Sequence, residues 1–527
     1  MKKLLVVTLL LLLQLPLDCY ASETFQQGNL LFTKLEQDDS CVSVAYVREI
    51  YRRATPISLR IPAEVINDRV RYKVTEVAAE GFARCMDISS IIIDEGVEKI
   101  GDEAFYGCCM LSSISLPSTI EEIGEGILGN CQKLSSINVA ENNKKYNSMD
   151  GCNAIILTDS KELVVGCNFS TIPSHVRKIS SYAFYCCMGL QKLDIPEGVE
   201  EIKWRAFWGC AKLGDLHLPL TLTTLAGEAF NGCSSLKSVY IPKNVNDIMY
   251  NPFTYCSGLD RIEVDKENKE YNSHGNSNAI IETATNRLVT GCCNTVIPRT
   301  CQKIEMMTFC GTLRLTSMYI PASVKEICDG AFMDNPCLVA LDVDKNNKFY
   351  DSRDNCNCVM RTKDSTVVLG CASSSIPSTA TSIGAYSFCG VNTPRIVSLP
   401  INVKRIDHNA FMNCNTIEEL ILSSSVKNIG KQAFSCCRSL RSVTLGDGTS
   451  KIGGLNFMDC TNLSYIYIPD GISEIEERAF RGCSKLYGIS IPRSVKSIAV
   501  DAFDGCPVRE NVWKQYGGRK GCQELSE

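Results

Sequence analysis

Residues 486–508 read LYGISIPRSVKSIAVDAFDGCPV, and residues 463–485 read LSYIYIPDGISEIEERAFRGCSK. Both follow the same frame, L-x-x-I-x-I-P-x-x-V-x-x-I-x-x-x-A-F-x-x-C-x-x. A fixed period of this length predicts a solenoid, in which each repeat forms one coil that stacks on its neighbours. Units with this frame begin at Ile88, Leu111, Leu190, Leu213, Leu236, Leu315, Pro394, Ile417, Leu440, Leu463 and Leu486.

Three longer units occupy 134–189, 259–314 and 338–393, and with them the register runs from 88 to 508 without a slip. Each is interpreted as a double coil, in which a long coil is followed by one of ordinary length that begins at Cys167, Cys292 or Cys371. Two apolar runs in each long coil, such as 154–157 and 163–165, predict a β-hairpin on one side of the solenoid. The long coils also share the motif N-x-x-Y-x-S, at Asn143, Tyr146 and Ser148; Asn268, Tyr271 and Ser273; and Asn347, Tyr350 and Ser352.

Strand geometry explains the first positions of the frame. Positions 4 and 6 are apolar while position 5 varies, which is the alternation of a short strand with one buried face. Proline often follows at position 7, where its missing N–H suits the end of a strand. Positions 3 and 5 are therefore expected to face solvent on one β-face of the solenoid.

Position 18 is Phe in nearly every coil, and this recurrence predicts a continuous core ladder. Each ring can bury roughly 150–250 Å², so the ladder should supply most of the stability. The residues are Phe105, Phe184, Phe207, Phe230, Phe253, Phe309, Phe332, Phe388, Phe411, Phe434, Phe457, Phe480 and Phe503.

The chain has 30 cysteines, yet the register argues against a disulfide framework. Twelve lie at position 21, where other coils carry Thr312, Asn335 or Val391. These residues indicate a small inward-facing slot, in which free Cys acts as a small apolar residue. The better disulfide candidates lie outside the register, at Cys41, Cys152, Cys328, Cys356, Cys358 and Cys522.

The N-terminus predicts export. Lys2 and Lys3 precede an apolar stretch over 4–13, and Cys19-Tyr20-Ala21 fits a cleavage site, so residues 1–21 are expected to be a signal peptide cleaved after Ala21. The alternative is a lipoprotein anchored through Cys19, although the preceding residues fit that signal poorly. No later apolar run is long enough to cross a membrane, so a secreted or outer-surface location is expected. The net charge of −5 over 527 residues is too dilute to indicate nucleic acid or an anionic membrane.

The repeating frame with A-F-x-x-C resembles the BspA-like leucine-rich repeat proteins. The start is also similar to theirs, with a hairpin over 28–32 and 42–46 and a first Phe82-x-x-Cys85. The resemblance implies a leucine-rich repeat solenoid, curved or superhelical, that is mainly β, with one strand and a short helical or irregular segment per coil. It also implies surface or secreted proteins, some of them adhesins for host extracellular-matrix proteins or other microbes. No sortase motif follows Cys506, which leaves the mode of attachment open.

The expected organisation is one continuous solenoid over 88–508. A cap hairpin and first coil over 22–87 precede it, and a cap or tail over 509–527 follows. Nothing in the sequence indicates an enzyme, a cofactor or a metal site. The four histidines fall at unrelated frame positions, and no nucleophile, zinc or phosphate-binding motif is present.

The candidate ligand-binding face consists of outward strand positions. Exposed tyrosines on a rigid sheet are anchors that protein interfaces use, although strands favour Tyr in any case. We therefore expect a scaffold for a protein ligand; the alternative is a carbohydrate-binding or nutrient-handling component, favoured if the tyrosines line a groove rather than a flat face. The candidate residues are Tyr240, Tyr319, Tyr465, Tyr467, His217, Arg261 and Glu263.

Overall fold

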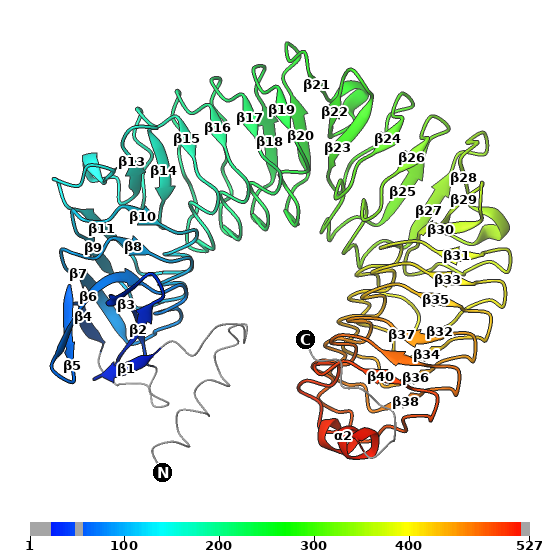
Figure 1. The fold of residues 1–527 in the computed structure, drawn as a ribbon. Coiled ribbons are helices and arrows are strands. Elements are labelled where there is room, and N and C mark those ends of the chain that lie inside the picture. The colour runs from blue at the N-terminus through cyan, green and yellow to red at the C-terminus, as the bar shows by residue number, and fades with distance from the viewer. Residues whose placement is uncertain (1–22, 48–55, 518–527) are drawn as a thin grey trace. The chain divides into compact units, whose positions relative to one another are not determined.

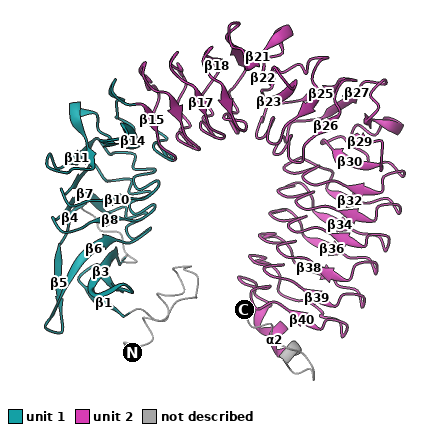
Figure 2. Cartoon of the chain, turned by 45° about the horizontal axis from the view of Figure 1, so that its top comes forward, with its two compact units in different colours: residues 1–176, 182–188 teal, residues 177–181, 189–527 magenta. Residues whose placement is uncertain are grey.

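A computed structural model describes residues 23–47 and 56–517. The expected signal peptide, Cys19 and Cys522 lie outside these residues. The chain forms two compact units, residues 1–176 with 182–188, and residues 177–181 with 189–527 (Figure 2). Each unit is a stack of coils whose strands run parallel from one coil to the next (Figure 1). The predicted leucine-rich repeat solenoid is confirmed in both.

Strands at frame positions 3–6 of successive coils pair side by side and form the first sheets, which make up the β-face. In unit 1 one such sheet contains β4 (Ile57–Ile61), β7 (Ile88–Ile93), β9 (Ser113–Leu116) and β11 (Ser136–Val139). In the described part of unit 2 these strands form three separate sheets. One pairs β18 (Ser238–Ile241) with β20 (Arg261–Val264), and another pairs β25 (Ser317–Ile320) with β27 (Ala340–Val343). The third contains β32 (Ile396–Ser398), β34 (Glu419–Ile421), β36 (Ser442–Thr444) and β38 (Tyr465–Tyr467). The β-face is thus interrupted after each long coil.

A second kind of sheet arises from two-residue strands at positions 12 and 13, which the sequence did not reveal as strands. Their apolar residue at position 13 points into the core. In unit 1 they are β8 (Lys99–Ile100) and β10 (Glu122–Ile123). In unit 2 they are β15 (Lys178–Ile179), β16 (Glu201–Ile202), β17 (Thr224–Leu225), β19 (Asp247–Ile248), β24 (Lys303–Ile304), β26 (Glu326–Ile327), β31 (Ser382–Ile383), β33 (Arg405–Ile406), β35 (Asn428–Ile429), β37 (Lys451–Ile452), β39 (Glu474–Ile475) and β40 (Ser497–Ile498).

The predicted hairpins are present in all three long coils. The antiparallel strands are β12 (Tyr146–Asn147), β13 (Ile155–Leu157) and β14 (Glu162–Val165); β21 (Tyr271–Asn272), β22 (Ala279–Glu282) and β23 (Arg287–Gly291); and β28 (Tyr350–Asp351), β29 (Val359–Arg361) and β30 (Thr366–Leu369). In the second and third long coils the last strand continues the second sheet, because β23 pairs with β24 and β30 with β31. These hairpins are therefore part of the stack rather than a separate flank.

The ends differ from the repeats. The predicted N-terminal hairpin is β2 (Leu30–Leu35) with β3 (Asp38–Tyr46), joined by β1 (Thr24–Gln27), β5 (Glu64–Asn67) and β6 (Val70–Val77). Near the C-terminus α2 (Arg509–Gly517) buries Val512. The other helices described are three 3-10 turns in the long coils, η1 (Met149–Gly151), η2 (His274–Asn276) and η3 (Arg353–Asn355). The segment around position 18 consists of turns rather than helix.

The motif N-x-x-Y-x-S holds each long coil to the coil before it. In the second long coil, the Asn268 amide donates to the carbonyls of Pro242 and Val245, both at 2.9 Å. The Tyr271 hydroxyl accepts from the N–H of Ile248 at 2.8 Å. The Ser273 hydroxyl accepts from the N–H of Val264, so a side chain caps the free edge of β20. This cap satisfies a backbone N–H at the edge where the first sheet stops.

The Phe ladder is the core, as predicted. All thirteen residues are at most 4% exposed. In unit 2 the paired rings stack with centroids 4.7–5.8 Å apart and planes within 17° of each other. The position-21 cysteines are buried beside the ladder, and every described cysteine is unbridged. Cys41, Cys152, Cys328, Cys356 and Cys358 are thus free thiols in this structure.

Candidate ligand-binding face

The predicted tyrosines stand on the outer face of the first sheets. Tyr240, Tyr319, Tyr465 and Tyr467 are between 46% and 55% exposed. Their strand neighbours at positions 4 and 6 are buried, which confirms the alternation read from the sequence. The four rings do not form one cluster, because they belong to three separate sheets, through β18, β25 and β38.

Tyr465 and Tyr467 form the clearest aromatic pair. They lie two residues apart on β38, on the same face, and pair across to Ser442 and Thr444 on β36. Since these neighbours are small, no large side chain on β36 covers the two rings. The pair therefore presents flat aromatic surface with a polar tip, which suits a protein interface.

Tyr240 and Tyr319 have a different environment, because each hydroxyl is held by an aspartate of the next coil. The Tyr319 hydroxyl donates to Asp344 at 2.7 Å. Tyr240 bonds Asp265 in the same way, and this hydrogen bond raises the pKa of Tyr240 to about 12. The pKa of Asp265 is lowered, first by the backbone N–H of Glu267 and then by Tyr240. The two rings are consequently fixed against the sheet.

A groove lies along β20 and the turn that follows it. A hollow of about 660 Å³ is lined by 260–266 and by residues of 268–278. A second hollow of about 410 Å³ shares Glu263, Val264, Asp265 and Lys266 with it and adds Tyr240 and Lys243. Since Tyr240 pairs across to Glu263, the two hollows form one polar groove over neighbouring coils.

The charges of this groove are largely paired with one another. Arg261 bonds Glu263 at 2.8 Å, and Lys243 lies 3.2 Å from Glu267. Asp260 pairs with Arg314, whose guanidinium also donates to two backbone carbonyls. A groove with balanced charges and amide side chains offers donors and acceptors without a strong net field. It therefore fits a neutral polar ligand better than a highly charged one.

The sequence identified part of this groove and missed the rest. Tyr240, Arg261 and Glu263 were predicted and are brought together. His217 is exposed but is not among the lining residues, and Tyr319, Tyr465 and Tyr467 lie on other sheets. Asp265, Lys266 and His274 were missed, because the fold of the long coil after β20 determines their position.

An aromatic cluster on the turn side was also missed. The Arg205 guanidinium lies 4.2 Å from the centre of the Trp204 ring and 5.4 Å from that of Trp208. Arg205 also forms an ion pair with Glu228 at 2.9 Å. Trp204 remains 41% exposed. Positions 15 and 19 of the frame vary between coils, so the sequence gave no reason to single out these two residues.

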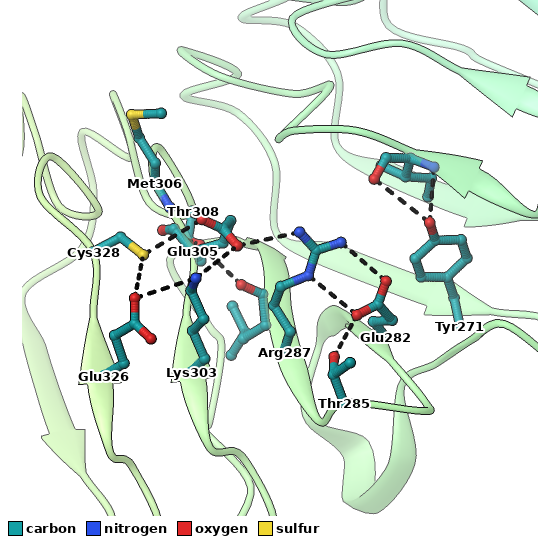
Figure 3. Close-up of polar contacts among 12 residues, drawn as sticks. Tyr271, Glu282, Thr285, Arg287, Lys303, Glu305, Met306, Thr308, Glu326 and Cys328 are labelled. Carbon is teal, nitrogen blue, oxygen red and sulfur yellow. Dashed lines mark hydrogen bonds and ion pairs between the residues drawn. The ribbon is translucent and has the colours of Figure 1, made fainter.

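The hairpin side of the second long coil carries a polar network (Figure 3). Arg287 on β23 bonds Glu282 at 3.0 Å and Glu305 at 3.2 Å, and Lys303 bonds Glu326 at 3.2 Å. Burial by itself raises the pKa of Glu305. The hydrogen bonds from the N–H of Met306 and from the Arg287 guanidinium together outweigh this effect, so the pKa of Glu305 is below its usual value. This network ties the hairpin to the next two coils.

Cys328 lies at the edge of the same network. Cys328 donates to Glu305 at 3.4 Å, and burial together with that carboxylate raises the pKa of the thiol to about 12. Cys328 is therefore protonated at neutral pH, the unreactive form. Among the described side chains, no group of three or more His, Cys, Asp or Glu is arranged to hold a metal ion.

None of the helices in the described part of the chain has the length and apolar character needed to cross a membrane.

Comparison with known proteins gives one family. The family model for the BspA type leucine rich repeat region matches six copies, over residues 69–155, 165–280, 287–359 and 370–486. A search of curated proteins gave no match.

Several solved structures are similar to the chain. A leucine rich cell surface protein from Faecalibacterium prausnitzii is 22% identical, with 93% of each chain covered and a TM-score of 0.38. A leucine-rich repeat protein from Eubacterium ventriosum is 19% identical, with 93% of this chain and 96% of that chain covered and a TM-score of 0.33. One from Bacteroides ovatus is 19% identical, with 95% and 98% covered and a TM-score of 0.29.

Proposed function

Because the chain belongs to the BspA type leucine-rich repeat family, we propose that it is a non-enzymatic, exported scaffold that binds a protein ligand through the exposed face of its first sheets. In this proposal it acts at the cell surface as an adhesin for host matrix proteins or other microbes. The single observation that carries the proposal is the Tyr465 and Tyr467 pair, two half-exposed rings on a strand whose backbone is fixed by β36.

The physical argument is pre-organisation. A parallel strand held by its neighbours loses little conformational freedom on binding, and Tyr has few rotatable bonds to immobilise. The core ladder lies behind the sheet, so ligand contacts on the outer positions leave the packing undisturbed. The ordered stack thus separates the residues that stabilise the fold from those available to a partner.

The experiment is a binding panel with the purified chain and labelled matrix proteins, with unrelated glycoproteins and a glycan array as comparison. The proposal expects saturable binding to one matrix protein that survives enzymatic removal of its glycans. Binding lost on deglycosylation, or found only on the glycan array, would contradict a protein ligand.

A second candidate is a carbohydrate-binding or nutrient-handling role, which the groove beside Tyr240 favours. Tyr240 lines this groove together with Glu263 and Lys266, and a groove rather than a flat face is what a sugar chain requires. Ring faces and paired polar groups suit hydroxyl-rich ligands. The glycan array separates this role from the first, because the Tyr240→Ala variant should lose array binding while the Tyr465→Ala variant keeps it.

A further inference from the structure

Two thiols lie next to each other in the third long coil. The Sγ atoms of Cys356 and Cys358 are 2.9 Å apart, with the Cys358 thiol donating to Cys356. Asn357 between them has a φ of 51°, in the left-handed region. This turn brings the side chains at 356 and 358 together, although they are only two residues apart.

The two thiols are in different states. The hydrogen bond from Cys358 lowers the pKa of Cys356 to about 6, whereas the same contact raises the pKa of Cys358. Cys356 is thus the more acidic thiol of the pair, and Cys358 is the one that holds its proton more tightly. A thiolate beside a thiol is the arrangement from which thiol–disulfide exchange proceeds.

The other two long coils show that the turn does not need the cysteine pair. The corresponding residues are Cys152, Asn153 and Ala154 in the first coil, and Ser277, Asn278 and Ala279 in the second. Asn153 and Asn278 have φ values of 48° and 57°, so the backbone is the same. The paired thiols are therefore a chemical feature of the third coil alone among the three.

We propose that Cys356 and Cys358 form an intramolecular disulfide when the folding chain meets a small-molecule disulfide such as oxidised glutathione. The Cys356 thiolate attacks one sulfur of the reagent and releases a thiolate, leaving a mixed disulfide on Cys356. Cys358 then loses its proton and attacks the Cys356 sulfur, which expels the second thiolate. The two cysteines are oxidised by two electrons, and the reagent is reduced to two thiols.

The disulfide forms while the chain folds, before the third long coil is fully packed. Both side chains are at most 1% exposed in the folded chain, so a glutathione-sized reagent reaches them only before the next coil packs. An exported chain folds in a compartment where such oxidants act. The bridge then closes a turn that the native backbone already forms.

The bridge acts on the end of the first sheet. The Asn357 side chain accepts from the N–H of Leu341 at 2.7 Å and donates to the carbonyl of Val339 at 2.8 Å, which caps β27. A disulfide across Asn357 holds its left-handed conformation and therefore keeps this cap in place. Amide hydrogen exchange at Leu341 should be slower in the bridged chain than in the reduced chain.

The test is refolding of the full chain from denaturant, with reduced glutathione alone or with a reduced and oxidised mixture. Free thiols are alkylated under denaturing conditions, and the peptide spanning 356–358 is weighed after digestion. The proposal expects this peptide to lose two hydrogens and to escape alkylation only after oxidising refolding. Two alkylated thiols under that condition, or a bridge from either residue to Cys371, would overturn it.

Two control variants copy residues from one long coil into another. Cys358→Ala copies the first long coil and removes the resolving thiol, so after oxidising refolding Cys356 should carry glutathione as a mixed disulfide, and the peptide spanning 356–358 should not lose two hydrogens. The double change Ser277→Cys and Ala279→Cys copies the third coil into the second and should produce a second bridged peptide. If the grafted pair fails to bridge while Cys356 and Cys358 do bridge, the pairing depends on the surroundings in the third coil and the proposal for 356–358 stands. If neither pair forms a bridge, the proposal is refuted.

Discussion

The Cys460 thiol donates a hydrogen bond to the backbone carbonyl of Phe434, 3.2 Å away in the preceding coil. The same bond recurs along the stack, for example from Cys437 to Phe411 and from Cys483 to Phe457, both at 3.1 Å. Asn335 replaces the thiol in one coil and donates to Phe309 at 2.9 Å. Position 21 is therefore a donor that ties each coil to the Phe of the coil before it, as well as a small buried slot.

We expect Cys460→Val to destabilise the chain by about 1 kcal/mol, because it fills the slot but leaves the Phe434 carbonyl without its donor. Cys460→Ser keeps a donor in a smaller side chain and should cost less than Val if the hydrogen bond dominates. The free energy of unfolding in urea, measured on both variants, decides the order. A Val variant more stable than the Ser variant would show that the slot is purely steric.

The Phe ladder predicts a larger loss. Phe434 is fully buried and stacks on Phe411 and Phe457, so Phe434→Ala should cost about 3–5 kcal/mol through lost burial and a cavity. Phe349 is 43% exposed and supplies the control, since Phe349→Ala should change the melting temperature little. Equal melting curves for Phe434→Ala and the parent would exclude the ladder as the core.

The sequence predicted the repeat, the Phe ladder and the outward tyrosines because each recurs at a fixed frame position. It did not predict the second sheet, since a two-residue strand such as β16 is too short to show alternation. The break of the first sheet after each long coil was missed for a different reason. It depends on Asn278 and Ser273, side chains distant in sequence from the strand N–H groups they cap.

The candidate site was less predictable than the fold. Exposure of Tyr465 follows from alternation, whereas the groove beside Tyr240 depends on how the long coil returns across β20. The shared motif marked Tyr146, Tyr271 and Tyr350 as recurring residues, but the sequence did not show that they are buried. They are at most 6% exposed, and the hydroxyls of Tyr271 and Tyr350 accept from backbone N–H groups of the coil before.

The motif of the long coils gives a third prediction. Asn268→Ala removes the donors for the carbonyls of Pro242 and Val245, so it should cost about 1–3 kcal/mol. Asn272 is the control within the same coil, because its amide donates to the exposed Thr283 hydroxyl and accepts from the N–H of His274, both in the same coil. Denaturant unfolding of both variants measures the difference. Equal midpoints for the two would mean that the Asn268 bonds contribute nothing to coil stacking.

The Glu305 network predicts a pH effect. The folded-state pKa of Glu305 is lowered from 4.5, so its contribution to stability is present above about pH 4.5 and is lost as the pH falls through the folded-state pKa. Glu305→Gln should therefore lower the melting temperature at neutral pH, and this difference should shrink in acid. Glu267→Gln breaks an exposed pair and should change little. A Glu305→Gln difference that persists unchanged below pH 3 would contradict this account.

The proposed interface is tested by the double change Tyr465→Ala and Tyr467→Ala. Both rings are on the outer face of β38 and outside the core, so the melting temperature should stay at the parent value. If the pair anchors the partner, the affinity for the matrix protein found in the binding panel should fall by about 2 kcal/mol or more. Tyr487 is 71% exposed, and Tyr487→Ala should leave binding unchanged. Unaltered affinity in the double variant, together with loss in Tyr240→Ala, would move the site to the groove beside β20.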